Sequence, residues 1–551
     1  MNKTILNQKI TTFLTTNNNI QKQTILLFLY FTAVSLVMIT SKYTFVNDLD
    51  DWILWSYLTA NEPRIMIMSY PLATVISALY DYFPQIQWYS ITVFFYISLI
   101  SLLFSFYISL LKDKYLKILT IVIVTIILVH IWLQVSVTIL TLLLIAVSIP
   151  LIRRHQVSFW ILLLVASFLR VGIIFSLLPF FILIYLILFD KRYFTVKKIL
   201  IILALACMVL LNYISPSFNK EYKEWLHYNN ARTYFADFKG NDKKNILSAD
   251  EKFISYIWYA NDDVLLPTQK TIEASGGLKD VLFDKLSMTF QSFRDVIAFL
   301  WHKEKQHRLL IFLIFLTLYI VYKERSNPSR MFYLLFIVGF FVATLLRDND
   351  RGFFPIIVAW GILIFIKLLD QRKILLLKGF LSIAIPLLII DLPVNRILNY
   401  QTNEKLKNEF IQLINKYPNM TYEVSESFPR ELNTIGYVFM QSHIFDEKDW
   451  VHPARENILF PSWTSRNPYV YDSHHISFNG KKRKYDSYYE FLTDKHVGFV
   501  GSKKVNKEVN DVILKMYTEK YSQHKNCYHV IKVVDESDHF SITKLIEKCD
   551  K

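Results

Sequence analysis

The segment "NDLDDW" places three aspartates within residues 47–52, directly after a long apolar run. A carboxylate beside a membrane boundary can take the proton of a hydroxyl as a general base, or it can help to hold a divalent metal ion. Asp50 and Asp51 are neighbours, so on a helix their side chains point about 100° apart and can serve different purposes. The same acids also suit a helix N-terminus, because Asp48 or Asp50 would cap a helix that begins near Trp52.

Three arginines have surroundings that suit the binding of an anion. Arg170 lies in the apolar stretch 158–189, where we expect a helix break at "LRVG". An arginine at membrane depth is costly unless it faces a polar cavity or an anionic partner. Arg347 and Arg351, in "RDNDRGFFP", could bind a phosphate through paired hydrogen bonds. The alternatives are an Arg170 side chain that extends to the outer interface, and a loop in which the other two arginines pair with nearby acids.

Together, these acids and arginines suit the transfer of a glycosyl group from a lipid phosphate. A phosphate neutralised by arginine leaves readily, so one base is enough, whereas a glycoside hydrolase uses a pair of carboxylates. The sequence contains neither of the common Gly-rich phosphate loops, which favours a lipid-anchored donor over a nucleotide sugar. No zinc-ligand spacing and no Ser-His-Asp arrangement stand out.

The elements that must position these residues are membrane helices. The 551 residues are 53% hydrophobic and 16% aromatic, and their mean hydropathy is +0.29, which exceeds the usual composition of a soluble domain. A helix needs roughly 17 to 25 mostly apolar residues to cross the hydrocarbon layer. About eleven apolar runs approach or meet this length. They are residues 24–41, 88–111, 116–134, 136–151, 158–169, 171–189, 198–216, 309–322, 331–346, 352–369 and 374–393.

Basic residues cluster at alternate connections between these runs, as expected of connections that face the cytoplasm. We therefore predict a multi-pass protein of the cell membrane, with a cytoplasmic N-terminus and an outer C-terminus. The first run lacks a small-residue cleavage site, so we expect it to remain as a helix. Three regions would lie on the outer face: a first loop over 42–88, a second over 217–308 and a domain over 395–551. This topology and the basic outer domain account for the net charge of +15 without a nucleic-acid partner.

The outer regions contain further predicted elements. In the first loop, "DDWILWSYLTA" and "MSYPLATVISALYDYF" predict two helices that lie along the membrane surface or pack as core. After a membrane domain over 1–394, residues 395–551 mix strands ("NMTYEVS", "HVGFVGS", "CYHVIKVV") with amphipathic helices ("NEKLKNEFIQLINKY", "KEVNDVILKMYTEKY"). The sequence therefore predicts a small extracytoplasmic α/β domain at the C-terminal end. Cys527 and Cys549 fall in this domain, and they would pair only in an oxidising compartment.

These motifs resemble those of the GT-C glycosyltransferases, a polytopic class that uses polyprenyl-phosphate sugar donors on the outer face of a membrane. The resemblance is carried by "NDLDDW", by the two predicted surface helices after it, by "FLRVG" and by "RDNDRGFFP". More narrowly, "DDWILWSYLTANEP", "SALYDYFPQIQWYS", "YNNARTYFADF" and "PSWTSRNPYVYD" resemble segments of a family of bacterial membrane proteins of this architecture. Where those proteins carry a Gly-containing stretch after the acidic pair, this chain has "YLTANEP".

The resemblance implies a role for each candidate residue. Asp50 would be the base that activates the acceptor, and Asp51 a supporting carboxylate or, with Asp48, a ligand of a divalent metal ion. Donor phosphate would be bound by Arg170, Arg347 and Arg351. The segment "HYNNAR" would either line an acceptor groove or have a structural role, and its candidate residues are Tyr228, Asn229 and Arg232.

The resulting hypothesis is an inverting hexosyltransferase that moves a sugar from a polyprenyl-phosphate donor to a glycan or glycolipid of the cell envelope. Its partners would be the lipid-linked donor, the acceptor, the membrane lipids and a glycosyltransferase on the cytoplasmic side that makes the donor. A transporter or flippase of lipid-linked saccharides is one alternative, and it would need a continuous polar path through the spans. A non-catalytic envelope scaffold is another, in which the acids of "DLDDW" would tolerate alanine.

Overall fold

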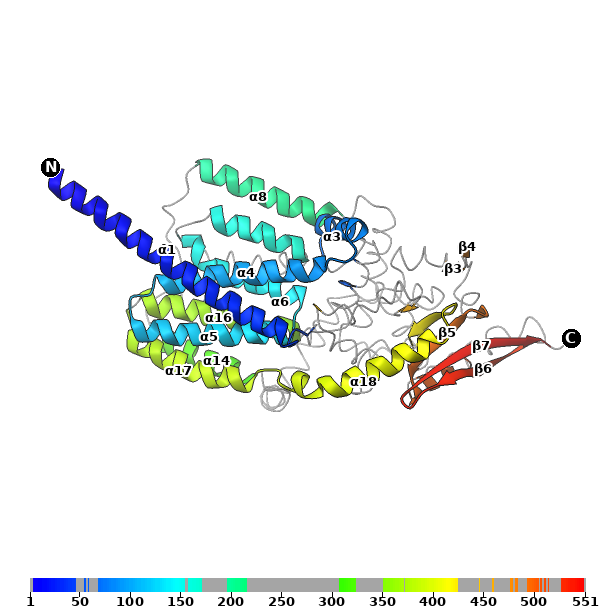
Figure 1. Ribbon diagram of the computed structural model, residues 1–551. Coiled ribbons are helices and arrows are strands. Elements are labelled where there is room, and N and C mark those ends of the chain that lie inside the picture. Colours follow the sequence, from blue (N-terminus) through cyan, green and yellow to red (C-terminus); the bar gives the residue numbers. More distant parts are fainter. Residues whose placement is uncertain are drawn as a thin grey trace, which may run out of the picture.

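The structure, a computed structural model, describes the chain in parts, which Figure 1 draws in colour. The described residues are 3–45, 54–55, 58, 68–153, 157–170, 196–215, 307–323, 350–370, 372–424, 445, 458–459, 476–478, 481–483, 493–504, 506–507, 510–511, 514 and 527–549. Most of them are helical, and a small sheet follows in the C-terminal part.

Nine of the eleven predicted apolar runs coincide with helices. The first of these helices, α1, starts well before its apolar run. The other two runs, 171–189 and 331–346, lie outside the described residues. The nine helices are α1 (Lys3–Thr40), α4 (Trp88–Ser109), α5 (Lys114–Leu133), α6 (Val137–Ser148), Val157–Arg170, α8 (Val196–Ile214), α14 (His307–Lys323), α16 (Asp350–Asp370) and α17 (Ile374–Ile390).

Within the described part of the chain, three helices are long and apolar enough to cross a membrane: Asn18–Thr40 in α1, Trp88–Ser109 and Lys114–Leu133. Hydroxyl groups inside the helices bond back to a carbonyl one turn earlier, as Ser105 does to Ser101 and Thr141 to Val137. Such bonds satisfy polar groups where lipid offers no partner. The sequence prediction of a helical membrane protein is confirmed to this extent.

The apolar helices pack side by side into one bundle (Figure 1). Helix α1 packs on α4 and α5, α16 packs on α6 and α14, and α17 packs on α5. A short helix of the first predicted outer loop, α3 (Tyr70–Tyr82), packs on α4. It buries Ala73, Ile76 and Tyr80 and exposes Val75 and Tyr82, so one face packs on the bundle and the other bears exposed hydrophobic side chains. From the other predicted surface helix, the described residues Leu54, Trp55 and Leu58 are buried, which favours core packing for that segment.

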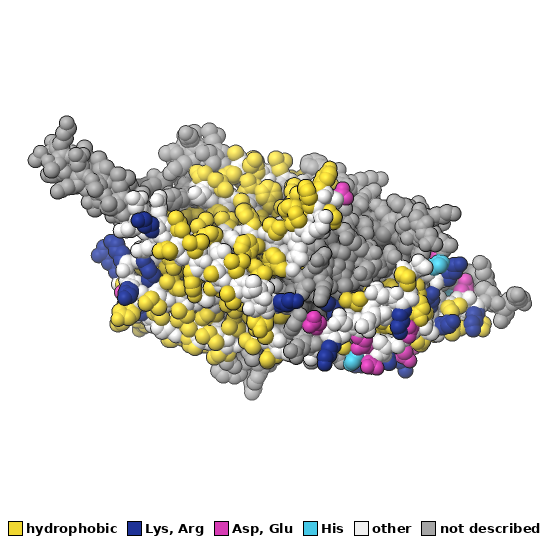
Figure 2. Space-filling model, viewed as in Figure 1, with side chains coloured by type: hydrophobic (Ala, Val, Ile, Leu, Met, Phe, Trp, Pro, Cys, Tyr) yellow, Lys and Arg dark blue, Asp and Glu magenta, His cyan; other side chains and the backbone are white. Residues whose placement is uncertain are grey.

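One end of the bundle is basic. Figure 2 shows Lys and Arg side chains gathered at the end away from the C-terminal sheet, with hydrophobic side chains over the helices between. We call it the basic end, and it includes exposed Lys22, Lys112, Lys114 and Arg372. There Lys378 forms an ion pair of 2.8 Å with Asp113, which also caps α5 by accepting a hydrogen bond from the backbone N–H of Leu116.

The C-terminal part holds α18 (Asn395–Asn415) and a mixed sheet of five strands in the order β2-β1-β5-β7-β6. Strand β1 pairs in parallel with β2 and β5, whereas β7 is antiparallel to both β5 and β6. The strands are β1 (Thr421–Val424), β2 (Ile458–Leu459), β5 (Val497–Ser502), β6 (Cys527–Glu536) and β7 (Phe540–Cys549). A separate hairpin is formed by β3 (Ile476–Phe478) and β4 (Lys481–Arg483). The three predicted strands and the first predicted amphipathic helix are therefore present, whereas β2, β3, β4 and β7 were not predicted.

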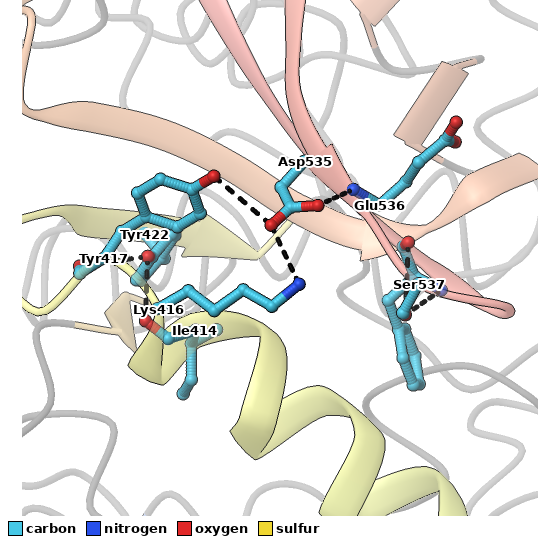
Figure 3. A network of polar contacts seen from close by, with 8 residues as sticks. Ile414, Lys416, Tyr417, Tyr422, Asp535, Glu536 and Ser537 are labelled. Carbon is cyan, nitrogen blue, oxygen red and sulfur yellow. Dashed lines mark hydrogen bonds and ion pairs between the residues drawn. The ribbon is translucent and has the colours of Figure 1, made fainter.

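A polar network ties the end of α18 to β6 (Figure 3). Lys416 and Tyr417 both donate to Asp535 Oδ2, at 3.0 and 3.2 Å, and the Tyr422 hydroxyl donates to the carbonyl oxygen of Ile414. The hydrogen bond from Lys416 is the main reason that the pKa of Asp535 lies below its usual range. Burial is the main reason that the pKa of Tyr422 is raised. This network fixes the sheet against the helix that leads to it from the bundle.

Candidate functional site

The residues between α5 and α6 form a polar corner at the end of the bundle opposite the basic end. We call residues 130–138 the α5–α6 corner. His130 and Gln134 are buried at the end of α5, and Ser136 and Thr138 are buried at the start of α6. The Ser136 hydroxyl accepts a hydrogen bond from the Thr138 backbone N–H at 3.2 Å, so Ser136 caps α6.

The segment that leads into the acidic motif is bound to this corner. The backbone N–H of Phe45 donates to the Trp132 carbonyl at 3.0 Å, and the backbone N–H of Val135 donates to the Phe45 carbonyl at 2.7 Å. The side chains of Phe45 and Trp132 are both fully buried. Two backbone hydrogen bonds and a buried ring therefore hold the chain at a point two residues before the first residue of "NDLDDW".

The segment "RDNDRGFFP" meets the same corner through its phenylalanine. Phe354, in the first turns of α16, stacks on the His130 ring with 3.7 Å between ring centroids and an interplanar angle of 13°. The side-chain nitrogen of Gln134 is hydrogen-bonded to Nε2 of His130. The His130 ring is thus held by Phe354 on one face and by Gln134 at one edge.

Arg170 contacts the corner from a third direction. It is the last described residue of helix Val157–Arg170, is half-buried, and donates a hydrogen bond to the Thr138 hydroxyl. The preceding turn is fixed as well, because the Ser69 backbone N–H donates to the Phe168 carbonyl at 3.2 Å and Asn212 donates to Ser167 at 3.0 Å. The guanidinium group therefore sits at the end of the bundle, on a rigid support, beside the first turn of α6.

A residue of the predicted outer domain also reaches this end. The ring centroid of Phe445 lies 6.1 Å from that of Trp132, and the Gln87 side chain donates to the Phe445 carbonyl at 3.0 Å. Phe94 lies near Trp132 as well, with ring centroids 6.4 Å apart. Aromatic side chains from three parts of the sequence thus cover the α5–α6 corner.

Of the predicted site residues, the structure describes only Arg170 with its side chain. Arg351 lies in the first turn of α16, and its backbone alone is described. The predicted base and metal ligands, the remaining arginine of the phosphate motif and the predicted acceptor residues lie outside the described residues. They are Asp48, Asp50, Asp51, Arg347, Tyr228, Asn229 and Arg232. The structure does describe residues near them. Phe45, just before the acidic motif, and Phe354, within "RDNDRGFFP", both contact the α5–α6 corner, as Arg170 does.

The described residues include no group of three or more His, Cys, Asp or Glu side chains placed to hold a metal ion. The candidate ligands Asp48 and Asp51 are not among them, so metal binding by this pair stays a prediction.

An apolar cavity of about 240 Å³ lies between α4, α5, α14, α16 and α17. Its lining is almost entirely aliphatic and aromatic, and the hydroxyls of the lining residues Tyr107 and Thr120 each donate to a backbone carbonyl. Two lining residues, Ile127 and Ile357, lie one helical turn from His130 and Phe354. We therefore place the candidate chemistry at the α5–α6 corner and regard the cavity as space for hydrocarbon next to it.

Sequence reasoning missed the polar residues of the corner itself. It searched the apolar runs for permanently charged side chains and found Arg170, and neither His130 nor Gln134 is of that type. A signal was present, because these two residues are four positions apart in "HIWLQ" and so share one face of a helix. Uncharged polar pairs at this spacing inside an apolar run can therefore indicate a site.

The fold and the corner define a helical membrane protein with a small C-terminal sheet and a buried polar corner at one end of its bundle. No family model, no curated protein and no solved structure matches the chain.

Proposed function

We propose that the protein is a membrane glycosyltransferase that moves a sugar from a polyprenyl-phosphate donor to a glycan or glycolipid of the cell envelope. In this proposal the α5–α6 corner faces the outer side, and the reaction occurs in front of it. The acidic motif supplies the base, and the arginines hold the donor phosphate.

The observation that supports this proposal is the meeting of three distant segments at one corner. Phe45 pairs with Trp132 and Val135, Arg170 donates to Thr138, and Phe354 stacks on His130. Asp50 is five residues after Phe45, and Arg351 is three residues before Phe354. At up to about 3.6 Å for each extended residue, five residues span at most about 18 Å, which limits how far Asp50 can lie from the corner.

The proposed chemistry is an inverting transfer in a single displacement. Asp50, as a carboxylate, would take the proton of an acceptor hydroxyl while its oxygen attacks the anomeric carbon of the donor. The bond between that carbon and the phosphate oxygen breaks, and the phosphate leaves with both bonding electrons and with its charge balanced by arginine. Attack from the side opposite the leaving phosphate inverts the anomeric carbon. No general acid is needed, because a phosphate whose charge is balanced by arginine leaves without taking up a proton.

The position of the apolar cavity is consistent with a lipid-linked donor. A prenyl chain must leave water when its phosphate reaches the corner, and a cavity with an apolar lining accepts hydrocarbon without cost to polar groups. A water-soluble nucleotide sugar has no hydrocarbon chain that could occupy such a cavity. The cavity therefore favours lipid phosphate over nucleotide as the donor class.

The experiment compares envelope glycans by mass spectrometry in cells that carry the wild-type chain, the Asp50→Asn variant, or no chain. We expect Asp50→Asn to reproduce the loss of one sugar residue seen without the chain, because the amide cannot take a proton. Asp81→Asn is the matched control, because Asp81 is an exposed carboxylate at the end of α3. Unchanged glycans with Asp50→Asn, at equal protein level in the membrane, would remove Asp50 as the base.

A further inference from the structure

The two cysteines of the C-terminal sheet are cross-strand neighbours. Cys527 is the first residue of β6 and Cys549 is the last residue of β7, and the two are register partners. The register is regular over seven consecutive pairs, from Cys527 opposite Cys549 to Val533 opposite Thr543. The irregularity between Val533 and Asp535 lies near the hairpin turn, far from the cysteines.

This register brings the cysteines within bonding range. Directly opposite residues of an antiparallel pair have Cα atoms about 4.5 or 5.5 Å apart, depending on the type of pair. A disulfide spans Cα separations of about 4.4 to 6.8 Å. Both types of pair therefore satisfy the backbone requirement. We propose that Cys527 and Cys549 form a disulfide that closes the open end of the β6–β7 hairpin.

The surroundings leave this end accessible to an oxidant. Tyr528 and Lys548, which are register partners next to the cysteines, are both exposed. The opposite end of the hairpin is already closed, because the Ser537 backbone N–H donates to the Phe540 carbonyl at 2.9 Å. The disulfide would thus join the strands at the end where no turn does so.

The bond forms by disulfide exchange with an oxidised thiol–disulfide oxidoreductase outside the cytoplasm. One cysteine thiolate attacks a sulfur of the donor disulfide, which gives a mixed disulfide and releases one donor thiol. The second cysteine thiolate then attacks the protein sulfur of the mixed disulfide and releases the other donor thiol. The two cysteines lose two electrons, the donor disulfide gains them, and the two protons pass to the donor thiols.

The proposal is independent of glycosyl transfer and depends on the outer location of the C-terminal part. It also predicts that the three cysteines of the chain differ in their reactivity toward a thiol reagent. Cys207, on α8, is a free thiol, whereas the pair would be protected. Counting free thiols in the full-length chain therefore tests it directly.

For this test, bacterial membranes that contain the full-length chain are quenched in acid, dissolved in SDS and treated with maleimide–PEG, with and without prior reduction. We expect one tag per chain before reduction and three after it, because the chain has three cysteines. In the Cys207→Ala variant we expect none and two. In Cys527→Ser, the unpaired Cys549 should add a second tag before reduction.

Peptide mapping identifies the bond. Trypsin cleaves after Lys525 and Lys548, so the disulfide would link "NCYHVIK" to "CDK" in one peptide that reduction separates. Three tags before reduction would overturn the proposal. A reducible dimer of the chain in place of the linked peptide would also overturn it, because it would show pairing between molecules.

Discussion

At the basic end of the helix bundle, polar side chains are exposed or half-buried and pair with each other, whereas at the α5–α6 corner they are buried among aromatic rings. Lys378 meets Asp113 at the basic end, close to solvent. His130 and Gln134 bond to each other beneath Phe354 at the corner. Pairing near water costs little, but burial of polar groups costs free energy that packing must offset. This difference is the reason that we propose the corner, and not the basic end, as the reaction site.

The largest effect is expected from removing the ring at the centre of the corner. Trp132 is 0% exposed, and its backbone carbonyl accepts from Phe45. We expect Trp132→Ala to destabilise the bundle by about 3–5 kcal/mol, as for other large aromatic deletions in a core. Thermal unfolding in detergent would measure it. Tyr115→Ala is the control at the basic end, where the side chain is 72% exposed, and an equal loss in both variants would contradict the difference between the ends.

The second effect concerns activity. Arg170→Lys keeps the positive charge but loses the planar fork that binds two phosphate oxygens at once. We expect sugar transfer to fall about a hundredfold, which corresponds to about 2.7 kcal/mol in the barrier. Arg372→Lys makes the same change at the basic end and should leave transfer unchanged. Equal rates for the two variants would remove Arg170 from the site.

The third effect concerns the polar pair in the corner. His130→Phe keeps a ring against Phe354 but leaves the buried Gln134 amide without its partner on that ring. An amide buried in this way costs about 1–3 kcal/mol, and we expect a loss of about 2 kcal/mol. The double variant His130→Phe with Gln134→Leu should recover much of it. If the double variant loses the sum of both single losses, the pair is not coupled.

The smallest effect is expected at the basic end. The hydrogen bond from Lys378 is the main cause that lowers the pKa of Asp113, and the bond from the Leu116 N–H adds to it. A carboxyl group whose pKa is lowered on folding adds stability above its unfolded pKa of about 4, and that stability is lost as the pH falls through the folded value. Asp113→Asn keeps a capping side chain without the charge. The small excess of wild-type Tm over this variant at pH 7 should therefore shrink below about pH 4. An excess that stays constant with pH would show that the ion pair does not contribute.

The sequence predicted most of the helices because a helix that crosses a lipid bilayer needs a long run of uncharged, mostly apolar residues. Helices α4 and α5 match their predicted runs to within a few residues. It also predicted β1, β5 and β6 from their alternation and turn residues. It did not predict β7, whose "FSITKLIEKC" carries three charges and whose assignment as a strand depends on its partners β5 and β6. Strand pairing at long range is set by such contacts and not by local pattern.

For the candidate site, the sequence predicted Arg170 because a charge at membrane depth is conspicuous. It could not predict that Phe45, Thr138 and Phe354 would meet, since their positions are far apart in the chain and the contact depends on helix packing. The roles of Asp50, Asp51, Arg347 and Arg351 stay predictions.

Labelling from outside the cell tests the central claim, that the α5–α6 corner faces outward and the basic end inward. Gln85 lies in the exposed connection before α4, and Lys112 lies in the exposed connection after it. Each is changed to cysteine in a chain whose three native cysteines are replaced, and intact cells are treated with a membrane-impermeant maleimide. We predict that Gln85→Cys is labelled in intact cells and that Lys112→Cys is labelled only after the membrane is opened. The reverse pattern would place the corner in the cytoplasm and contradict the account.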